Sequence, residues 1–327
     1  MKILIIRFSS IGDIVLTTPI VRSIKAQQPD VEIHYLTKIS FSTLLTNNPF
    51  IDKIHCYNDN LNKIIQELRK ENFDYIIDLH NNIRTTIVKL CLLKPSFSFN
   101  KLNLKKWLLV NLKINLLPEI HVVDRYFKAV EKLNIINDDL GINFFIPKNE
   151  QIIINELPLN LQKGYVALVI GGKHATKQLP ENILIHLCKE TKIPIVLLGG
   201  KEDRAKAENI RITSENLNIF NAAGIYSIHQ SASFIEKSLK VITSDTGLMH
   251  IASAFKKEII SVWGNTVPEF GMYPYFPEKE KYKSEILQVK GLKCRPCSKI
   301  GFNTCPEKHF NCMNQIDTNQ LLKHLQK

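Results

Sequence analysis

Residues 244–250, Ser-Asp-Thr-Gly-Leu-Met-His, have the types and spacing to bind a phosphate group. They follow a short aliphatic run and open a helix-like segment, so the amides of Thr246, Gly247 and Leu248 should lie at a helix N-terminus. Unpaired amide donors and the helix dipole both favour phosphate there, although the same polar residues could simply cap the helix. His250 lies one turn further on.

Two more strand ends in this half of the chain carry glycine pairs. They are Gly171-Gly172 in VIGGKHATKQLP and Gly199-Gly200 in VLLGGKEDR. Lys177 follows the first pair and is placed to reach a phosphate or a sugar hydroxyl. Three such strand ends predict a nucleotide-sugar pocket. Neither G-x-G-x-x-G nor a Walker A sequence occurs, which disfavours NAD chemistry and P-loop hydrolysis.

A single acid, Asp13, follows the first aliphatic run in RFSSIGDIVLTTPIVRSIK (7–25). A carboxylate at the end of a buried strand costs free energy unless it is paired or has a function. It could cap the next helix, or it could act on a substrate for which Gly12 leaves room.

The elements that must position these residues alternate between aliphatic runs and helix-like segments. In the first half we predict strands at 2–8, 31–37, 53–57 and 74–80, with helical spacing at 12–27, 40–47, 60–71 and 82–93. Such alternation predicts right-handed βαβ units and a parallel sheet covered on both faces. Pro19 must start a new helical segment or kink the first helix, with Thr18 as its N-cap.

The alternation breaks at 140–163, which is polar and interrupted by prolines. We therefore predict two domains, 1–150 and 151–327. After the break, strands are predicted at 165–170, 194–198, 217–221, 240–243 and 258–262. The predicted fold class is α/β, with two Rossmann-like, doubly wound domains that face each other across a cleft. Ligands bind at the carboxyl ends of the strands in such sheets.

Composition narrows the class of protein. The chain has 327 residues, of which 44% are hydrophobic and 23% charged, as in globular proteins. No apolar run could span a bilayer and no signal peptide is recognisable, so we expect a cytoplasmic protein. The net charge of +12 favours an anionic partner, although an AT-rich gene would also enrich lysine. Only two Trp and scattered Tyr accompany the basic residues, which argues against nucleic acid.

Residues 100–118, NKLNLKKWLLVNLKINLLP, are amphipathic and rich in Lys and Leu. They predict either a surface helix that covers the sheet or a segment that contacts a membrane surface.

Cys294, Cys297, Cys305 and Cys312 have the spacing C-x2-C-x7-C-x6-C, with His309 among them. Structural zinc, free thiols and disulfides formed on purification are all compatible with this pattern. The second pair lacks the tight spacing of common zinc modules, and we predict no metal site.

Three segments together resemble the ADP-heptose:lipopolysaccharide heptosyltransferases, glycosyltransferase family 9. These are residues 7–25, SDTGLMHIASAF with ISVWGNT (244–266), and the closing CRPC…CPEKHFNCMNQI (294–316). The resemblance covers essentially the whole chain. It implies a GT-B fold whose N-terminal domain binds the acceptor and whose C-terminal domain binds the ADP-sugar. It also implies an inverting transfer without a metal or other cofactor.

The resemblance makes Asp13 the candidate general base, a role that contributes roughly 10²–10⁴-fold to a rate. With the glycine-bearing strand ends, it gives a predicted donor site. Its members are Thr176, Lys177, Gly199, Asp245, Thr246, Gly247, Leu248 and His250. The predicted acceptor residues are Ser10, Gly12 and Arg84, and further candidate cations are Arg7, Arg22, Lys25 and Arg125. Leu179 stands where the family more often has Trp, which affects packing against the sugar.

The predicted function is transfer of a heptose from ADP-heptose to an inner-core lipopolysaccharide or lipooligosaccharide acceptor, an anionic glycolipid. The enzyme would work at the cytoplasmic face of the inner membrane, as a peripheral protein. The alternative is a GT-B glycosyltransferase with another nucleotide sugar and another surface-glycan acceptor. An inactive sugar-nucleotide-binding protein would have no need of an acid at position 13.

Overall fold

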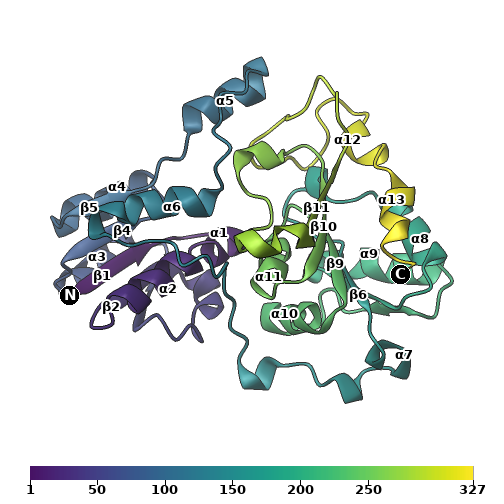
Figure 1. Cartoon of the computed structure of the whole chain (residues 1–327), viewed down its shortest axis with the longest axis horizontal. Helices are drawn as coiled ribbons and strands as arrows, with labels where there is room; N and C mark the ends of the chain where they lie inside the picture. Colours follow the sequence, from purple (N-terminus) through teal and green to yellow (C-terminus); the bar gives the residue numbers. More distant parts are fainter. Residues whose placement is uncertain (327) are drawn as a thin grey trace. The chain divides into compact units, whose positions relative to one another are not determined.

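The computed structural model describes residues 1–326, which form two compact units (Figure 1). The first unit contains Met1–Leu102 and Ile120–Phe145. The second contains Asn103–Glu119 and the residues from Ile146 onward. It thus includes residues 103–119, which the division at residue 150 assigns to the first domain. Each unit is built on one parallel sheet, and the predicted α/β class is confirmed.

The sheet of the first unit has the strand order β3-β2-β1-β4-β5, and all its pairings are parallel. Its strands are β1 (Lys2–Ile6), β2 (Glu32–Lys38), β3 (Lys53–Tyr57), β4 (Tyr75–Asp78) and β5 (Ser96–Ser98). The central strand β1 is covered on both faces and is therefore aliphatic along its length, with Ile3, Leu4, Ile5 and Ile6 fully buried.

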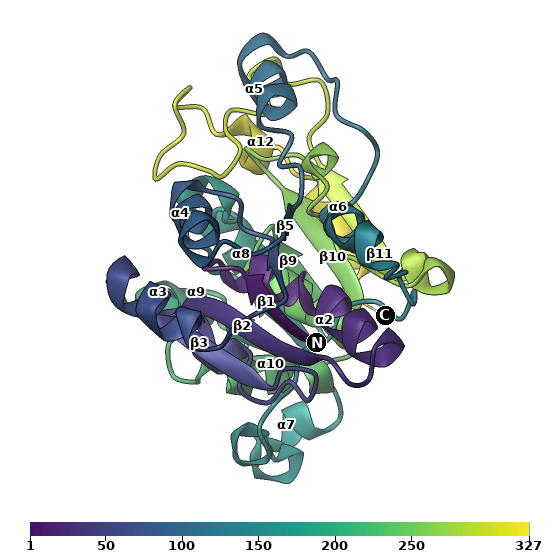
Figure 2. The same ribbon diagram turned by 90° about the vertical axis from the view of Figure 1, so that its left-hand side faces the viewer.

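Helices cover both faces of this sheet (Figure 2). One face packs against α3 (Leu61–Arg69) and α4 (Ile83–Leu92). On the other face, α2 (Thr18–Gln27) and α6 (Val122–Val130) contact each other. The short helix α1 (Ile11–Val15) precedes α2, and the 3-10 helices of the unit are η1 (Ile39–Leu44) and η2 (Glu131–Leu133).

Pro19 does begin a new helix, but Thr17 is its N-cap, so the assignment of Thr18 was wrong by one residue.

The sheet of the second unit has the order β11-β10-β9-β6-β7-β8. Its strands are β6 (Val166–Val169), β7 (Ile195–Leu198), β8 (Ile219–Asn221), β9 (Lys240–Ser244), β10 (Glu258–Trp263) and β11 (Ser284–Gln288). The order reverses between β6 and β9, which are neighbours in the sheet although two strands separate them in the sequence. Loops at such a reversal diverge to opposite faces and leave room for a ligand.

The helices of the second unit also divide between two faces. One apolar cluster joins the sheet to α8 (Glu181–Glu190), α9 (Arg204–Thr213), α12 (Asn311–Asn314) and α13 (Thr318–Lys323). The other joins it to α7 (Leu159–Gln162), α10 (Ile228–Lys237) and α11 (Gly247–Ala254). The 3-10 helices are η3 (Lys148–Glu150), η4 (Ile154–Glu156), η5 (Ala175–Lys177), η6 (Lys201–Asp203), η7 (Pro268–Phe270) and η8 (Glu278–Lys283).

Helix α5 (Asn103–Leu112) belongs to the second unit, through an apolar contact of Leu109 with Val267 and Phe270. A surface helix was predicted over the sheet; the helix occurs, but its apolar contact is with Val267 and Phe270. Across residues 1–326, no helix combines the length and the apolar character that crossing a bilayer requires.

Candidate active site

Asp13 lies in the first turn of α1, immediately after the loop that leaves β1. One carboxylate oxygen forms an ion pair with Arg7, at 2.5 Å. The other accepts hydrogen bonds from the backbone N–H of Ser10 at 3.1 Å and from its hydroxyl at 2.7 Å. Asp13 is therefore the N3 residue of a capping box whose N-cap is Ser10, which gives it the helix-capping role of the simpler interpretation. About a quarter of its side chain stays exposed, so capping does not exclude contact with a substrate.

Arg7 fixes the position of this carboxylate. Its guanidinium is buried and also donates to the carbonyls of Ser9 and Leu79. Leu79 follows β4, the neighbour of β1 in the sheet, so Arg7 joins two adjacent strand-end loops to Asp13. A planar guanidinium with several fixed donors suits this task better than a lysine would.

His80 is a residue of this region that the sequence did not point to. Its ring packs edge-on against Phe8, with ring centroids 5.3 Å apart. Burial, with the charges of Arg7 and Lys101, lowers the pKa of His80 to about 4, so the imidazole is neutral at physiological pH. The only signal was its place as the last residue of the strand predicted at 74–80.

The other predicted acceptor-side residues divide into two groups. Ser10 and Gly12 lie beside Asp13, with Ser10 exposed and Gly12 buried. Arg84 is exposed in the first turn of α4.

Two further candidate cations form ion pairs within the first unit. Arg22 pairs with Asp138 at 2.6 Å, and Lys25 pairs with Asp52 at 2.8 Å. These contacts hold the loop structure of the unit and give both residues a structural role.

In the second unit, residues from three loops meet around one carboxylate. Lys177 in η5 pairs with Asp245, which follows β9, at 2.6 Å. The hydroxyl of Thr266, which follows β10, donates to the same carboxylate oxygen at 3.0 Å. The structure thus brings together Lys177 and Asp245, two residues assigned to the donor site from segments 68 positions apart.

The N-terminus of α11 lies next to this ion pair. Thr246 is its N-cap in an extended conformation, and Gly247 and Leu248 form the first turn. No side chain caps their amides within the described chain, which leaves them for a ligand or solvent. A Cβ on Gly172 would lie 3.4 Å from the Thr246 methyl group, so the loop after β6 closely approaches this helix end. His250 is buried within α11.

One glycine in each of the two glycine-bearing loops has a packing explanation. A Cβ at Gly171 would lie 2.1 Å from a carboxylate oxygen of Asp203, and one at Gly199 would lie 2.8 Å from the same oxygen. Asp203 accepts a hydrogen bond from the Gly200 amide, and burial raises the pKa of its carboxyl. These two glycines therefore make room for Asp203.

The cysteine-bearing segment braces the donor-side loops. Arg295, between the first two cysteines, donates to the carbonyls of Gly264 and Thr266. Thr176 binds the backbone of Phe302 through both its hydroxyl and its amide. The sequence drew attention to the cysteines and missed Arg295, whose position inside C-R-P-C was the available signal.

The thiols themselves are free. The sulfur of Cys297 donates to the carbonyl of Cys294 at 3.1 Å, and that of Cys294 lies 3.9 Å from His309 Nε2. Burial raises the pKa of Cys297 to about 12 and that of Cys312 to about 11, so both are protonated at neutral pH.

Comparison with known proteins shows which family and which structures the chain resembles. A family model for glycosyltransferase family 9 (heptosyltransferase) matches residues 61–301. Lipopolysaccharide heptosyltransferase 1 from Campylobacter coli is 28% identical over 289 residues, covering 81% of this chain and 84% of that protein. The structure of the family 9 glycosyl transferase from Veillonella parvula DSM 2008 has a TM-score of 0.78 at 19% identity, covering 98% of this chain and 95% of that one. The ADP-heptose LPS heptosyltransferase II of E. coli has a TM-score of 0.72 at 18% identity, covering 99% and 97%.

The two parallel sheets and these structural neighbours define the GT-B fold. The chain belongs to glycosyltransferase family 9 (heptosyltransferase), because the family model matches most of its length. The predicted family is thereby confirmed.

Proposed function

We propose that this protein transfers a heptose from ADP-heptose to the inner core of a lipopolysaccharide or lipooligosaccharide. Family membership and the names of the relatives support the sugar and the acceptor class. The structural observation that carries the proposal is the group of Lys177, Asp245 and Thr246 at the N-terminus of α11. It combines a cation, hydrogen-bonding side chains and helix-end amides, which is what a sugar diphosphate requires.

On the donor side, the amides of Gly247 and Leu248 would bind the diphosphate. As the bond between the anomeric carbon and the diphosphate oxygen breaks, its electron pair goes to the departing ADP. Helix-end amides and the Lys177 ammonium would stabilise that added negative charge. Asp245 would accept hydrogen bonds from sugar hydroxyls while Thr266 keeps it in place.

On the acceptor side, an acceptor hydroxyl would attack the anomeric carbon from the face opposite the leaving group, which inverts the configuration. Asp13 would take the hydroxyl proton as the new bond forms. Arg7 and Ser10 hold its carboxylate by three contacts, so the base is oriented before the substrate arrives. Neither step calls for a metal ion in this proposal.

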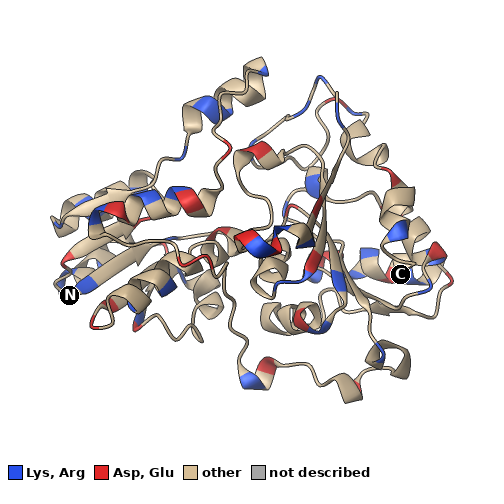
Figure 3. Cartoon of the chain, in the orientation of Figure 1, with Lys and Arg blue, Asp and Glu red and all other residues tan. Residues whose placement is uncertain are grey.

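Helix α5 is suited to contact the membrane in which a glycolipid acceptor is embedded. Leu104 and Trp107 are 71% and 50% exposed. The helix carries lysines and no acidic residue (Figure 3). Exposed apolar side chains beside lysines favour an anionic bilayer surface. Replacing both apolar residues by Ser should lower sedimentation with vesicles of anionic phospholipid and leave ADP affinity unchanged. Equal sedimentation of the variant would contradict this part of the proposal.

A thermal-shift screen of nucleotide sugars tests the proposed donor. A ligand present at 100 times its Kd should stabilise the folded state by about 2.7 kcal/mol. We expect ADP and ADP-heptose to raise Tm, and UDP- and GDP-sugars to leave it unchanged. Stabilisation by a UDP- or GDP-sugar alone would favour a glycosyltransferase that uses another nucleotide sugar, and it would overturn the proposal of ADP-heptose as donor. NMR assignment of the new anomeric centre then tests inversion.

A further inference from the structure

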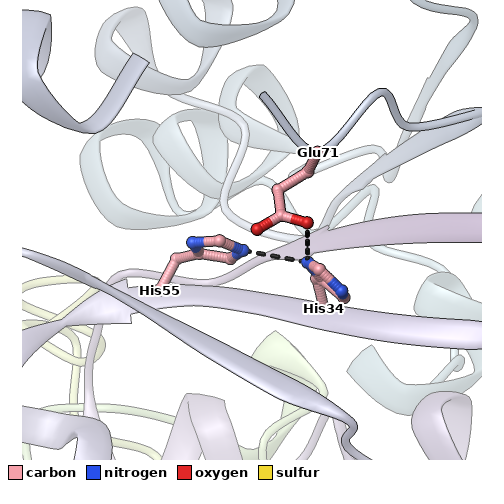
Figure 4. Close-up of side chains that lie close together, drawn as sticks. All are labelled: His34, His55 and Glu71. Carbon is pink, nitrogen blue, oxygen red and sulfur yellow. Dashed lines mark hydrogen bonds and ion pairs between the residues drawn. The ribbon is translucent and has the colours of Figure 1, made fainter. Parts of the chain in front are cut away.

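A second group of titratable side chains lies close together in the first unit (Figure 4). His34 is on β2, His55 is on β3, and Glu71 lies between α3 and β4. Both imidazoles are fully buried, while Glu71 is partly exposed. One nitrogen of each histidine and one carboxylate oxygen all lie within 4.8 Å of one another. The proposed transfer reaction uses none of these three residues.

The outer nitrogen of each imidazole is bound to a carboxylate. His34 Nε2 lies 2.6 Å from Glu32, and His55 Nδ1 lies 2.8 Å from Glu67. Ionised carboxylates only accept hydrogen bonds, so both outer nitrogens must carry the proton. Metal-binding histidines are usually held in this way, with the second ring nitrogen donating to a carboxylate.

The inner nitrogens face each other. His34 Nδ1 and His55 Nε2 are 2.9 Å apart. Two neutral imidazoles carry two protons, and the two outer contacts use both. The inner pair then presents two lone pairs to the same point, an arrangement that needs either a third proton or a metal cation.

Glu71 supplies negative charge at this point. One of its oxygens lies 3.8 Å from His34 Nδ1. Its two oxygens accept hydrogen bonds from Lys2 at 3.2 Å and from Lys53 at 2.5 Å. Each carboxylate oxygen has two lone pairs, so the lysine contacts leave acceptor sites for a cation.

We propose that His34, His55 and Glu71 bind one divalent transition-metal ion of the zinc type. Two imidazoles and a carboxylate are a common ligand set for such an ion. Zinc–nitrogen bonds of about 2.0–2.1 Å in a tetrahedron place two nitrogens about 3.3 Å apart, so the histidines need to separate by only a few tenths of an ångström. Phe73 packs edge-on against both rings and fixes their planes.

The ion would have a structural role. Its ligands lie on two neighbouring strands and on the segment that enters a third, so it would link β2, β3 and the start of β4. Asp13 instead follows the carboxyl end of β1. The proposed metal ligands therefore lie within β2 and β3 and before β4, whereas the proposed base lies in the helix beyond β1.

Metal analysis of the unmodified protein is the first test. Protein stripped with a chelator and reloaded with Zn²⁺ should retain one equivalent and gain thermal stability. With Co²⁺ it should show d–d absorption without a thiolate charge-transfer band, and X-ray absorption should show only nitrogen and oxygen ligands. Failure to retain an ion would overturn the proposal. Sulfur ligands on a single retained ion would assign it to the cysteine segment and would also overturn it.

Variants then locate the ion. His55→Gln should abolish retention of the equivalent, whereas His186→Gln, on the exposed side of α8, should not affect it. If the first variant fails to fold, Glu67→Gln provides a milder change, because Glu67 is half exposed. It removes only the carboxylate behind His55 and should weaken Zn²⁺ binding about 10–100-fold. Affinity equal to that of the control in both variants would overturn the assignment.

Discussion

Both units hold an aspartate in an ion pair just beyond the end of a strand, but the two pairs differ in how firmly they are held. Asp13 pairs with Arg7, which is buried and bound to two backbone carbonyls as well. Asp245 pairs with Lys177 through a single ammonium contact, and the carboxylate is also held by Thr266. In the first pair both partners are fixed, because Ser10 also holds the Asp13 carboxylate; in the second pair only the anion is fixed.

This difference separates the roles of the two cations. Arg7 cannot turn toward a ligand without leaving two carbonyls unpaired in a buried place, which costs free energy. Lys177 can rotate its flexible side chain to a phosphate and lose only one contact. The first pair therefore suits a base that must keep its orientation, and the second suits a site whose charges rearrange when a diphosphate enters and leaves.

Removing the carboxylate of the first pair should have the largest effect. Asp13→Asn should lower kcat roughly 10²–10⁴-fold, because the amide cannot accept the hydroxyl proton. The Kd for ADP, measured by calorimetry, should stay unchanged. Asp59→Asn, an exposed acid in the same unit, is the matched control and should retain full activity. Turnover of Asp13→Asn equal to that control would refute the general-base role.

Changing the fixed cation should have the next largest effect. Arg7→Lys keeps the charge but cannot reach the carboxylate and both carbonyls together. Loss of a hydrogen bond to a charged group should lower the free energy of unfolding by about 1.5–3 kcal/mol, measured in urea. If Arg7 positions the base, kcat should also fall at temperatures where the variant is fully folded, while the Kd for ADP stays unchanged. A loss of stability with unchanged kcat would leave Arg7 only a structural role.

The fold could be predicted from the sequence wherever strands are buried on both faces. The nine predicted strands all occur, because aliphatic runs such as ILII are typical of central parallel strands. The two missed strands, β5 and β11, read SFS and SEILQ and lie at sheet edges, where polar residues are tolerated. Helical spacing was predicted at residues 40–47, and the structure has the 3-10 helix η1 there. A helical pattern in so short a segment does not determine the helix type.

The candidate site was predictable where one local segment carries all its parts. The helix end at Thr246 was read directly from the sequence around it. The contacts of Arg7 with Leu79 and of Arg295 with Thr266 depend on which loops become neighbours after folding. Spacing along the chain holds no information on that adjacency. The unit to which α5 belongs was missed for the same reason, since it depends on the contact of Leu109 with Val267 and Phe270.

Removing the cation of the second pair, Lys177, should give a smaller but measurable effect. Lys177→Ala should weaken ADP binding about tenfold, or about 1.4 kcal/mol, as measured by calorimetry. Part of that loss would come from repulsion between phosphate and the carboxylate that remains at position 245. The double variant with Asp245→Asn removes this repulsion, and we expect its affinity to stay below that of Asp245→Asn alone. Recovery to that level would mean that Lys177 only neutralises Asp245. Lys189→Ala on α8 is the exposed control.

The smallest expected effect concerns the histidine beside each pair. Burial, with the charges of Arg7 and Lys101, lowers the pKa of His80 to about 4. Burial and the charges of Lys177 and Lys173 also lower the pKa of His174. A histidine whose folded pKa is depressed binds fewer protons when folded, so stability falls as the pH drops from about 6.5 toward 4. His80→Gln should flatten the decline of Tm over this range, and His174→Gln should change it little. Equal slopes of Tm against pH in the two variants would mean that the folded protein depresses the pKa of His80 no more than that of His174.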